Sequence, residues 1–314
     1  MRDLTGRTVD YLRLSVTDLC NYRCIYCMGE EGVCKLPHRE ICSIEELTEM
    51  SRAAVACGVR KIRLTGGEPL VRWGILDLCR MLRDLPGLEE LAMTTNGTLL
   101  PQMAGELKAA GVDRLNISLD TLDEARFRTI TRRGELREAL AGLAAAEAVG
   151  FTGTKVNAVL LGGVNDADIA PLAELARDRD LSVRFIELMP IGECADWPEE
   201  RFRTADAVLQ AVPALERIGQ DGVAELYRAP GWRGTVGLIR PISCCFCAAC
   251  DRIRITADGR LKPCLHSRQE ISLRGLHGME LEETIRQGVA VKPLRHHLAA
   301  GGSDSPRAMH EIGG

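Results

Sequence analysis

Two groups of closely spaced cysteines stand out in the 314-residue sequence, which contains thirteen cysteines in all. Cys20, Cys24 and Cys27 form the first group, with the spacing C-x3-C-x2-C. Thiolates this close in sequence converge on one soft metal centre. A cubane cluster has four irons, so three cysteines would leave one iron open to a substrate. Spacing alone leaves open a zinc loop, completed by Cys34 or His38, and three unrelated core thiols.

The second group consists of Cys247, Cys250 and Cys264, with Cys244 and Cys245 close by. Three further thiolates suggest another metal centre. The spacing C-x2-C is also typical of zinc sites, and Cys245 or His266 could complete a tetrahedron here.

Two arginines, Arg252 and Arg254, follow the second cysteine pair on alternate positions. Alternate residues of an extended strand lie on one face, so both guanidiniums would point the same way. Beside a metal centre they would form a site for an anionic ligand, preferably a phosphate bound bidentately. A solvated strand with surface arginines is the alternative.

The elements that must position these groups alternate between β-prone runs and helical patterns up to about residue 190. A capping box at Ser43-Ile-Glu-Glu46 begins one helix, and Gly58, Gly111 and Gly150 end helices just before a strand. Six strand–helix units in series predict a parallel sheet, either doubly wound or closed into a partial barrel. The predicted strands are Tyr11–Val16, Lys61–Thr65, Glu90–Thr94, Arg114–Leu119, Thr154–Leu161 and Val183–Leu188.

Polar motifs follow several of these strands, and parallel sheets bind ligands at the carboxyl ends of their strands. We expect the carboxylates of Glu68, Asp120 and Glu187 there to hydrogen-bond to loop backbone or ligands. After about residue 195 the alternation stops. The predicted division is a barrel domain over 1–225 and a smaller C-terminal module over 226–314.

The composition is that of an ordinary globular protein, with 46% hydrophobic and 27% charged residues. A net charge of −4 argues against a surface that coats nucleic acid. The sequence has no apolar run long enough for a membrane span and starts without a signal-peptide core. Free thiols suit a reducing compartment, so a cytoplasmic location is expected, with neither nucleic acid nor membrane as partner.

The first cysteine group, with Tyr26 before its last cysteine, resembles the cluster loop of radical S-adenosylmethionine (SAM) enzymes. Gly66-Gly-Glu-Pro69 resembles that superfamily's motif for the methionine amino group. The resemblance implies a partial (β/α)6 TIM-like barrel with SAM chelated to the open iron. One electron then cleaves SAM to a 5′-deoxyadenosyl radical.

The whole chain resembles one family of this superfamily, the GTP 3′,8-cyclases, which are lyases that begin molybdenum cofactor biosynthesis. The match includes Arg63-Leu-Thr-Gly-Gly-Glu-Pro69, Asn116-Ile-Ser-Leu-Asp120, Phe246-Cys-x-x-Cys250 and Ile312-Gly-Gly314. The R-x-R pair after the second cysteine pair, together with the Gly-Gly end, is specific to this family.

The family's functional residues carry over position by position, on the strength of that resemblance. Two [4Fe–4S] clusters are implied, one held by Cys20, Cys24 and Cys27 and the other by Cys247, Cys250 and Cys264. Catalysis would also involve Arg252, Arg254, Gly313 and Gly314. SAM would contact Tyr26, Gly67, Ser118 and Met189, while GTP would contact Arg13, Arg63, Thr94, Lys155, Arg252, Ile253 and Arg254, with Arg184 a further candidate.

The implied product is (8S)-3′,8-cyclo-7,8-dihydroguanosine 5′-triphosphate. The deoxyadenosyl radical removes the ribose 3′ hydrogen, the C3′ radical attacks C8, and the resulting aminyl radical is reduced. Implied partners are a flavodoxin- or ferredoxin-like electron donor and the cyclic pyranopterin monophosphate synthase that takes the product onward, with a homodimer also compatible.

Two other functions fit parts of the sequence. One is a peptide-modifying radical SAM maturase with auxiliary clusters, and the other is a zinc-binding or electron-transfer module without radical chemistry. The family usually has Cys-Met-Pro where this chain has Cys27-Met28-Gly29, which loosens the loop without removing a ligand. We expect Cys244 and Cys245 to be free thiols.

Overall fold

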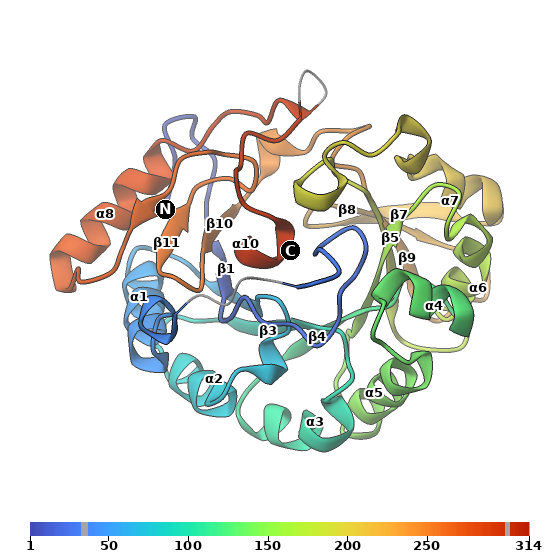
Figure 1. Ribbon diagram of the computed structural model, residues 1–314, viewed down its shortest axis with the longest axis horizontal. Coiled ribbons are helices and arrows are strands. Elements are labelled where there is room, and N and C mark those ends of the chain that lie inside the picture. The colour runs from blue at the N-terminus through green and yellow to red at the C-terminus, as the bar shows by residue number, and fades with distance from the viewer. Residues whose placement is uncertain (33–36, 299–301, 314) are drawn as a thin grey trace.

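A computed structural model describes residues 1–32, 37–298 and 302–313 of the chain (Figure 1). One twelve-stranded sheet forms its centre, in the order β12-β11-β10-β1-β2-β3-β4-β5-β6-β9-β8-β7. The six strands from β1 to β6 are parallel and lie next to one another in sequence order. A doubly wound sheet would reverse that order at a switch point, so the architecture is the partial barrel.

Each of these six strands matches its predicted range to within one residue at either end. In β1, β2 and β4 the buried Leu and Ile residues alternate with polar residues such as Arg13, Arg63 and Asn116, which lie on the opposite face of the sheet. The strands are β1 Tyr11–Ser15, β2 Lys61–Thr65, β3 Glu90–Thr95, β4 Arg114–Ser118, β5 Lys155–Leu160 and β6 Ser182–Glu187.

Helices cover the outside of the curved sheet (Figure 1). The predicted capping box begins the first of them: the Glu46 amide donates to Ser43 Oγ (3.1 Å), and the Ser43 amide donates to Glu46 Oε2 (2.7 Å). Gly58 follows that helix with φ at +110°, a conformation that favours glycine. The barrel helices are α1 Ile44–Ala56, α2 Ile75–Arg83, α3 Leu100–Ala109, α4 Glu124–Thr131, α5 Leu136–Ala148 and α6 Ile169–Glu174.

The C-terminal residues add strands to both edges of the barrel sheet. β9 pairs in parallel with β6, and β10 pairs in parallel with β1. β8 runs across the predicted boundary at residue 225, and the division into two domains stays a prediction. The elements here are α7 Asp206–Ala211, β7 Glu216–Asp221, β8 Ala224–Arg228, β9 Thr235–Ile239, β10 Arg252–Ile255, β11 Arg260–Lys262, β12 Ile271–Ser272, α8 Gly278–Ala290 and α10 Met309–Ile312.

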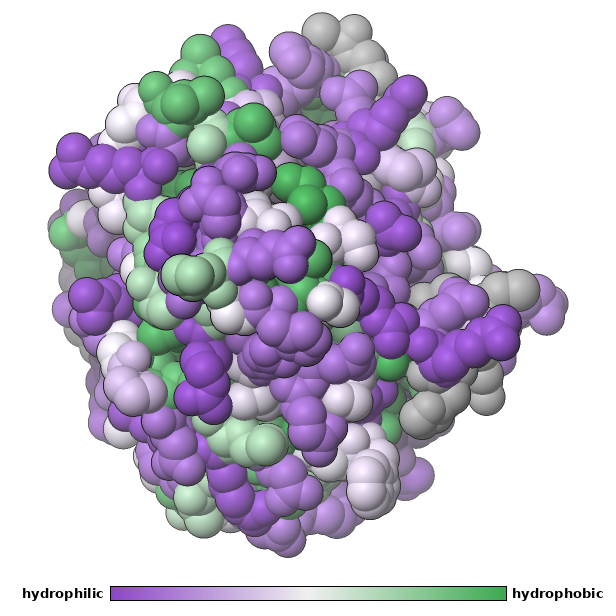
Figure 2. Space-filling view, turned by 90° about the vertical axis from the view of Figure 1, so that its left-hand side faces the viewer, coloured by the Kyte–Doolittle hydropathy of each residue, from purple (hydrophilic) through white to green (hydrophobic). Residues whose placement is uncertain are grey.

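Short 3-10 turns lie in the loops at His38–Glu40, Pro69–Val71, Asp166–Asp168, Gly192–Cys194, Glu199–Arg201 and Cys247–Ala249. The core lies between the sheet and the helices, where Leu12, Ile62 and Leu91 are fully buried. Hydrophilic side chains dominate the surface on the side of the molecule that carries α1 and α8 (Figure 2). Among the helices that the structure describes, none is both long enough and apolar enough to cross a bilayer.

Candidate functional site

The first cysteine group lies on the loop that follows β1. Cys20, Cys24 and Cys27 are free and partly buried. The Tyr22 amide donates to Cys20 Sγ (3.3 Å), and the Cys27 amide closes a turn on the Cys24 carbonyl (2.9 Å). Burial raises the pKa of Cys20 to about 11 and that of Cys27 to about 12. The thiolate forms therefore need a neighbouring cation, such as a bound metal ion.

Gly66-Gly67-Glu68 packs backbone to backbone against the cysteine loop. The Gly67 amide donates to the Thr17 carbonyl (2.9 Å), and the Glu68 amide donates to the Leu19 carbonyl (2.8 Å). A β-carbon on Gly67 would lie 2.3 Å from the Leu19 oxygen, so a larger residue cannot fit there without moving the loop. The glycine motif thus fixes the cysteine loop against the end of β2.

The strand-end carboxylates hold loops together, as predicted. Burial raises the pKa of Glu68 to about 7, yet its carboxylate accepts hydrogen bonds from the Thr95 hydroxyl (2.8 Å) and the Asn96 amide (2.7 Å). Asp120 accepts from the Tyr26 hydroxyl (2.8 Å). Glu187 accepts from the backbone amides of Ala205, Ile242 and Ser243. The carboxylates of Glu68, Asp120 and Glu187 thus hold the loops around the site in position.

The second cysteine group lies at the opposite end of the barrel. Cys247 and Cys250 precede β10, which is parallel to β1 with Arg252 beside Tyr11. The first group follows the carboxyl end of β1, so the length of that strand, about 13 Å, separates the two ends. β11 runs antiparallel to β10 and returns Cys264 to the same end as Cys250.

Arginines line the barrel between the two cysteine groups. Arg13 of β1 lies beside Arg254 of β10 and Arg63 of β2. Burial lowers the pKa of Arg13, and the charges of Arg254 and Arg252 lower it further. The Nε atoms of Arg13, Arg63 and Arg252 make no hydrogen bond within the described part of the chain. Crowded and unsatisfied cations of this kind fit an anionic ligand.

A second cationic group faces them from β5 and β6. Lys155 Nζ lies 2.6 Å from an Asp221 carboxylate oxygen, and Arg184 pairs with the same oxygen. Burial lowers the pKa of Lys155 to about 7, and the neighbouring charges of Arg184 and Arg114 contribute to this shift. Lys155 and Arg184 thus share the single carboxylate of Asp221. This leaves a net positive charge on the wall that β5 and β6 form.

The remaining predicted ligand residues lie at strand ends, in a loop or in the hydrophobic core. Thr94 and Ser118 are half-buried at the ends of β3 and β4, and Met189 lies in the loop after β6. The side chain of Ile253 belongs to the hydrophobic core, which leaves its backbone as the part that can contact a ligand. Its neighbours Arg252 and Arg254 point to the other face of β10.

Several buried polar residues of the barrel are not among the predicted ligand residues. Tyr11 Oη, Asn116 Oδ1 and Asn157 Oδ1 are buried and without a hydrogen bond inside the described ranges. Asn116 pairs with Lys155 across β4 and β5, and Asn157 pairs with Arg184 across β5 and β6. These three residues lie an even number of positions from a predicted ligand on the same strand, so the sequence could have placed them on the same face as that ligand.

The C-terminal segment enters the barrel, where α10 lies near its centre (Figure 1). Arg254 donates to the Ile312 carbonyl (3.0 Å) and also to the Gly313 carbonyl. His310 Nδ1 lies 3.1 Å from the Cys27 carbonyl oxygen. A β-carbon on Gly313 would lie 2.1 Å from Thr65 Oγ1, and its φ is +69°. Gly314 and Cys34 lie outside the described residues.

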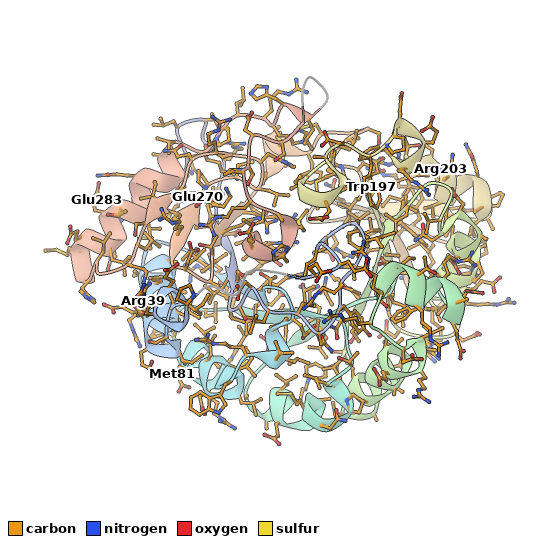
Figure 3. All side chains as sticks on the ribbon, viewed as in Figure 1. Arg39, Met81, Trp197, Arg203, Glu270 and Glu283 are labelled. Atoms are coloured by element: carbon orange, nitrogen blue, oxygen red, sulfur yellow. The ribbon has the colours of Figure 1, made fainter. Side chains whose placement is uncertain are left out.

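Acidic residues anchor this segment from outside. Arg307 donates to Asp258 Oδ2 (2.8 Å) and to Glu270 Oε2 (2.8 Å), and Figure 3 labels Glu270 among the side chains of this region. Lys262, which is fully buried, also pairs with Glu270 (3.0 Å). The anchor holds the segment in place on the side of β11.

Lys292 braces the second cysteine group. Its buried ammonium donates to the Arg252 carbonyl (2.7 Å) and to the Pro263 carbonyl (2.8 Å), directly before Cys264. Hydrogen bonds to a charged donor contribute about 1.5–3 kcal/mol each. We therefore expect Lys292→Met to lower the free energy of unfolding in urea by about 3 kcal/mol.

Lys108→Met is the matched control for this change, because Lys108 Nζ also donates to a carbonyl, that of Gly150 (3.3 Å), but in an exposed position. Its effect should stay within about 0.5 kcal/mol. Equal effects of the two substitutions would contradict a bracing role for Lys292.

Comparison with known proteins gives matches over most of the chain. The model of the radical SAM superfamily matches residues 14–176, and that named Molybdenum Cofactor Synthesis C matches residues 181–298. The relatives of this chain include proteins named GTP 3′,8-cyclase from several bacteria. The one from Peptoclostridium acidaminophilum is 49% identical over 98% of this chain and 97% of its own length. The one from Alkaliphilus oremlandii is 43% identical over the full length of both.

A solved structure shares the fold at low sequence identity. Streptococcus suis SuiB, in its crystal structure with the precursor peptide SuiA, superposes with a TM-score of 0.59 at 13% identity, over 91% of this chain and 67% of its own. At this identity the likeness concerns the fold alone. The family matches, the full-length relatives and the barrel with its cysteine loop lead to one conclusion: the chain belongs to the GTP 3′,8-cyclase family of the radical SAM superfamily.

Proposed function

We propose that this chain converts GTP to (8S)-3′,8-cyclo-7,8-dihydroguanosine 5′-triphosphate, the first step of molybdenum cofactor biosynthesis. The observation that supports this most strongly is the row of buried and half-buried arginines that runs between two cysteine groups at opposite ends of one barrel. Such a row of cations can bind a nucleotide whose two ends lie at the two cysteine groups.

We assign the first cysteine group to a [4Fe–4S] cluster and the loops around it to SAM. When bound, this cluster and SAM together supply a 5′-deoxyadenosyl radical. Gly67 keeps a β-carbon out of the space beside the loop, and Ser118 and Met189 come from the ends of β4 and β6. Tyr26 is fixed by its bond to Asp120, so its ring is held at one orientation.

We assign the cationic walls to the triphosphate and the second cysteine group to the purine end. A triphosphate carries about four negative charges, which offset the clustered cations of the barrel although the chain as a whole is acidic. Arg13, Arg63 and Lys155 would bind phosphate oxygens, with Thr94 and Arg184 beside them. Arg252 packs near the rings of Tyr11 (5.8 Å) and Phe246 (5.8 Å), which holds its guanidinium beside the second group.

We assign Cys247, Cys250 and Cys264 to a second [4Fe–4S] cluster with one iron left for the guanine. The Arg7 guanidinium donates to the Cys247 carbonyl (2.8 Å) and Lys292 donates next to Cys264, so both sides of this group are held by buried or half-buried cations. Holding the purine at one end and the phosphates along the wall places the ribose between them. The attack of C3′ on C8 of the same nucleotide is intramolecular, and fixing both ends would hold the nucleotide in the conformation in which the two atoms are close.

GTP affinity should fall above pH 7 because Lys155 loses its proton there. Its pKa is about 7 in the free protein, owing first to burial and then to Arg184 and Arg114, with Asp221 acting against them. Bound phosphate raises that pKa, so binding takes up a proton at higher pH. We expect Kd to rise by up to about tenfold per pH unit between pH 7.5 and 9, measured by equilibrium binding.

Lys155→Arg supplies the control, because arginine stays charged throughout this range. The Kd of this variant should be nearly constant from pH 7.5 to 9. The triphosphate itself is already fully ionised there, since its last pKa is about 6. A wild-type Kd without pH dependence would exclude Lys155 as a titrating phosphate ligand.

The direct test of the proposed function is an anaerobic incubation of the reconstituted chain with GTP, SAM and dithionite. We expect 5′-deoxyadenosine together with a cyclised nucleotide, and both only when GTP is present. Formation of 5′-deoxyadenosine with a peptide substrate but not with GTP would favour a peptide-modifying maturase. Zinc without labile sulfide, in a chain that forms no 5′-deoxyadenosine with either substrate, would favour a binding module.

The partners follow from the reaction. Each turnover needs electrons, so we propose a small flavodoxin- or ferredoxin-like donor in the cytoplasm, where the thiols of the described cysteines stay free. The product must then pass to the cyclic pyranopterin monophosphate synthase. A homodimer is compatible with this scheme and not required by it.

A further inference from the structure

Cys245, Cys247 and His296 form a compact group beside the second cysteine group. Their ligand atoms all lie within 4.8 Å of one another. Cys245 Sγ lies 3.6 Å from His296 Nε2. Ligands at about 2.3 Å for sulfur and about 2.0 Å for nitrogen, placed tetrahedrally, are about 3.5 Å apart. The observed separation therefore matches two ligands of one zinc-sized ion.

This arrangement differs from the ligand set of an iron–sulfur cubane. In a cubane each thiolate binds a different iron, so its ligands stand further apart than two ligands of a single ion. Cys250 and Cys264 do not belong to the compact group within the described residues. Cys247 is the member that the two ligand sets share.

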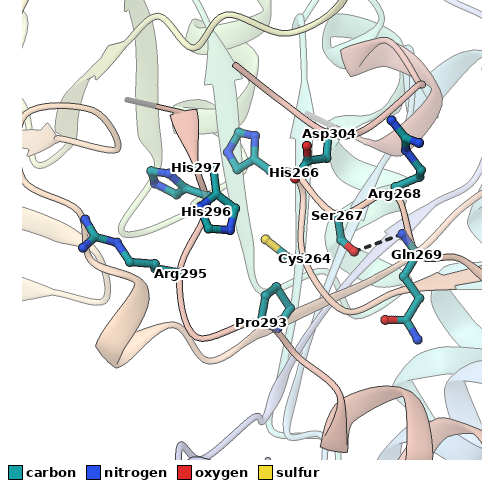
Figure 4. Close-up of a pocket in the computed structure, with 10 residues that line it drawn as sticks. All are labelled: Cys264, His266, Ser267, Arg268, Gln269, Pro293, Arg295, His296, His297 and Asp304. Carbon is teal, nitrogen blue, oxygen red and sulfur yellow. Dashed lines mark hydrogen bonds between the residues drawn. The ribbon is translucent and has the colours of Figure 1, made fainter. Parts of the chain in front are cut away.

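A pocket of about 260 Å³ borders this group, with His296 and Cys264 on its wall (Figure 4). The His266 ring packs edge to face against that of His296, with 5.0 Å between centroids, and His266 Nδ1 lies 3.3 Å from Ser303 Oγ. This packing restrains the orientation of the His296 ring. The pocket leaves room for a water molecule as the fourth ligand.

We propose that Cys245, Cys247 and His296 bind a single zinc ion in chains that lack the second cluster. Two thiolates and one imidazole with an open fourth position are a ligand set that zinc accepts. Because Cys247 belongs to both sets, zinc and the second cluster exclude each other. This exclusion depends on the proposed function, whereas zinc binding itself does not.

The binding test uses metal-free full-length chain with Cys24→Ser, which weakens metal binding at the first cysteine group. Titration with Co²⁺ should give one tetrahedral, thiolate-ligated ion per chain, visible by its absorption and displaced by Zn²⁺. Cys245→Ser and His296→Gln should each weaken Zn²⁺ binding by more than about 100-fold. Cys244→Ser and His297→Gln are the matched controls and should bind as the parent does.

The exclusion test measures iron instead of activity. Zn²⁺ added before reconstitution should lower the iron content of the wild-type chain from about eight to about four per chain, with loss of the second cluster's EPR signal. The Cys245→Ser chain should keep about eight under the same treatment.

The two proposals fail in different ways. Zn²⁺ affinity unchanged by both Cys245→Ser and His296→Gln, or a Cys245–Cys247 disulfide in place of bound metal, would overturn the zinc site and leave the cyclase function intact. Tight zinc binding in a chain that never cyclises GTP would contradict the proposed function and not the site.

Discussion

Cys24→Ser is expected to abolish the formation of 5′-deoxyadenosine altogether. Cys24 is partly buried, and burial raises the pKa of its thiol well above the usual value, with Cys27 and Asp120 adding to the shift. A serine hydroxyl there remains protonated and cannot replace a thiolate as a ligand to iron. The variant should retain only the iron of the second group, about four per chain against about eight in the wild type.

Cys57→Ser is the matched control for this substitution. Cys57 is a partly buried cysteine whose Sγ lies 3.5 Å from the Glu282 carbonyl, and a hydroxyl can make the same contact. Its iron content and rate of 5′-deoxyadenosine formation should equal those of the wild type. SAM cleavage by the Cys24→Ser chain at a measurable rate would contradict the assignment of this loop.

Arg254→Ala is expected to separate SAM cleavage from cyclisation. The Arg254 guanidinium, whose pKa burial lowers to about 10, lies among the other arginines and holds the C-terminal segment by the Ile312 and Gly313 carbonyls. Its loss frees the segment and removes a ligand of the nucleotide. A displacement of about 1 Å can reduce a rate about 100-fold, so we expect kcat/KM for cyclised product to fall by 100-fold or more.

Gly313→Ala should give the same result by a different route. Its β-carbon would meet Thr65 Oγ1 at 2.1 Å, and its backbone is in a region that alanine rarely adopts. If both substitutions act by releasing the segment, the double variant should be little worse than either single one. Additive losses would show that the segment and the arginine act independently. Both clusters should assemble in all three variants, as iron content and EPR can verify.

The sequence was sufficient for the barrel because short β-prone segments alternate with helical patterns along it. Strands such as β2, Lys61-Ile-Arg-Leu-Thr65, place apolar residues on alternate positions, and the helices between strands have clear capping and glycine signals, such as Ser43 and Gly58. The sequence also predicted the cysteine loop, since its three cysteines lie within eight residues of one another. Local patterns were enough for both.

The sequence could not predict that strands of the C-terminal part would extend the barrel sheet at both of its edges. β9 and β10 look like ordinary strands in sequence, and nothing local indicates that they pair with β6 and β1 respectively. The contact of Asp221 with Lys155 and Arg184 depends on the β7–β8 hairpin, which joins the sheet beyond β6 and β9 and whose turn follows Asp221, so it is likewise a matter of tertiary structure. The inward polar residues Asn116 and Asn157 became visible only through the register of the strands.

Isotope transfer from GTP to 5′-deoxyadenosine can show where the ribose of GTP is bound. The ribose is expected between the two ends of the barrel, within reach of the first cysteine group. With GTP deuterated at the ribose 3′ carbon, the 5′-deoxyadenosine formed should carry one deuterium per cyclised nucleotide. Unlabelled 5′-deoxyadenosine, or label that arrives only from another ribose position, would contradict this placement of the ribose.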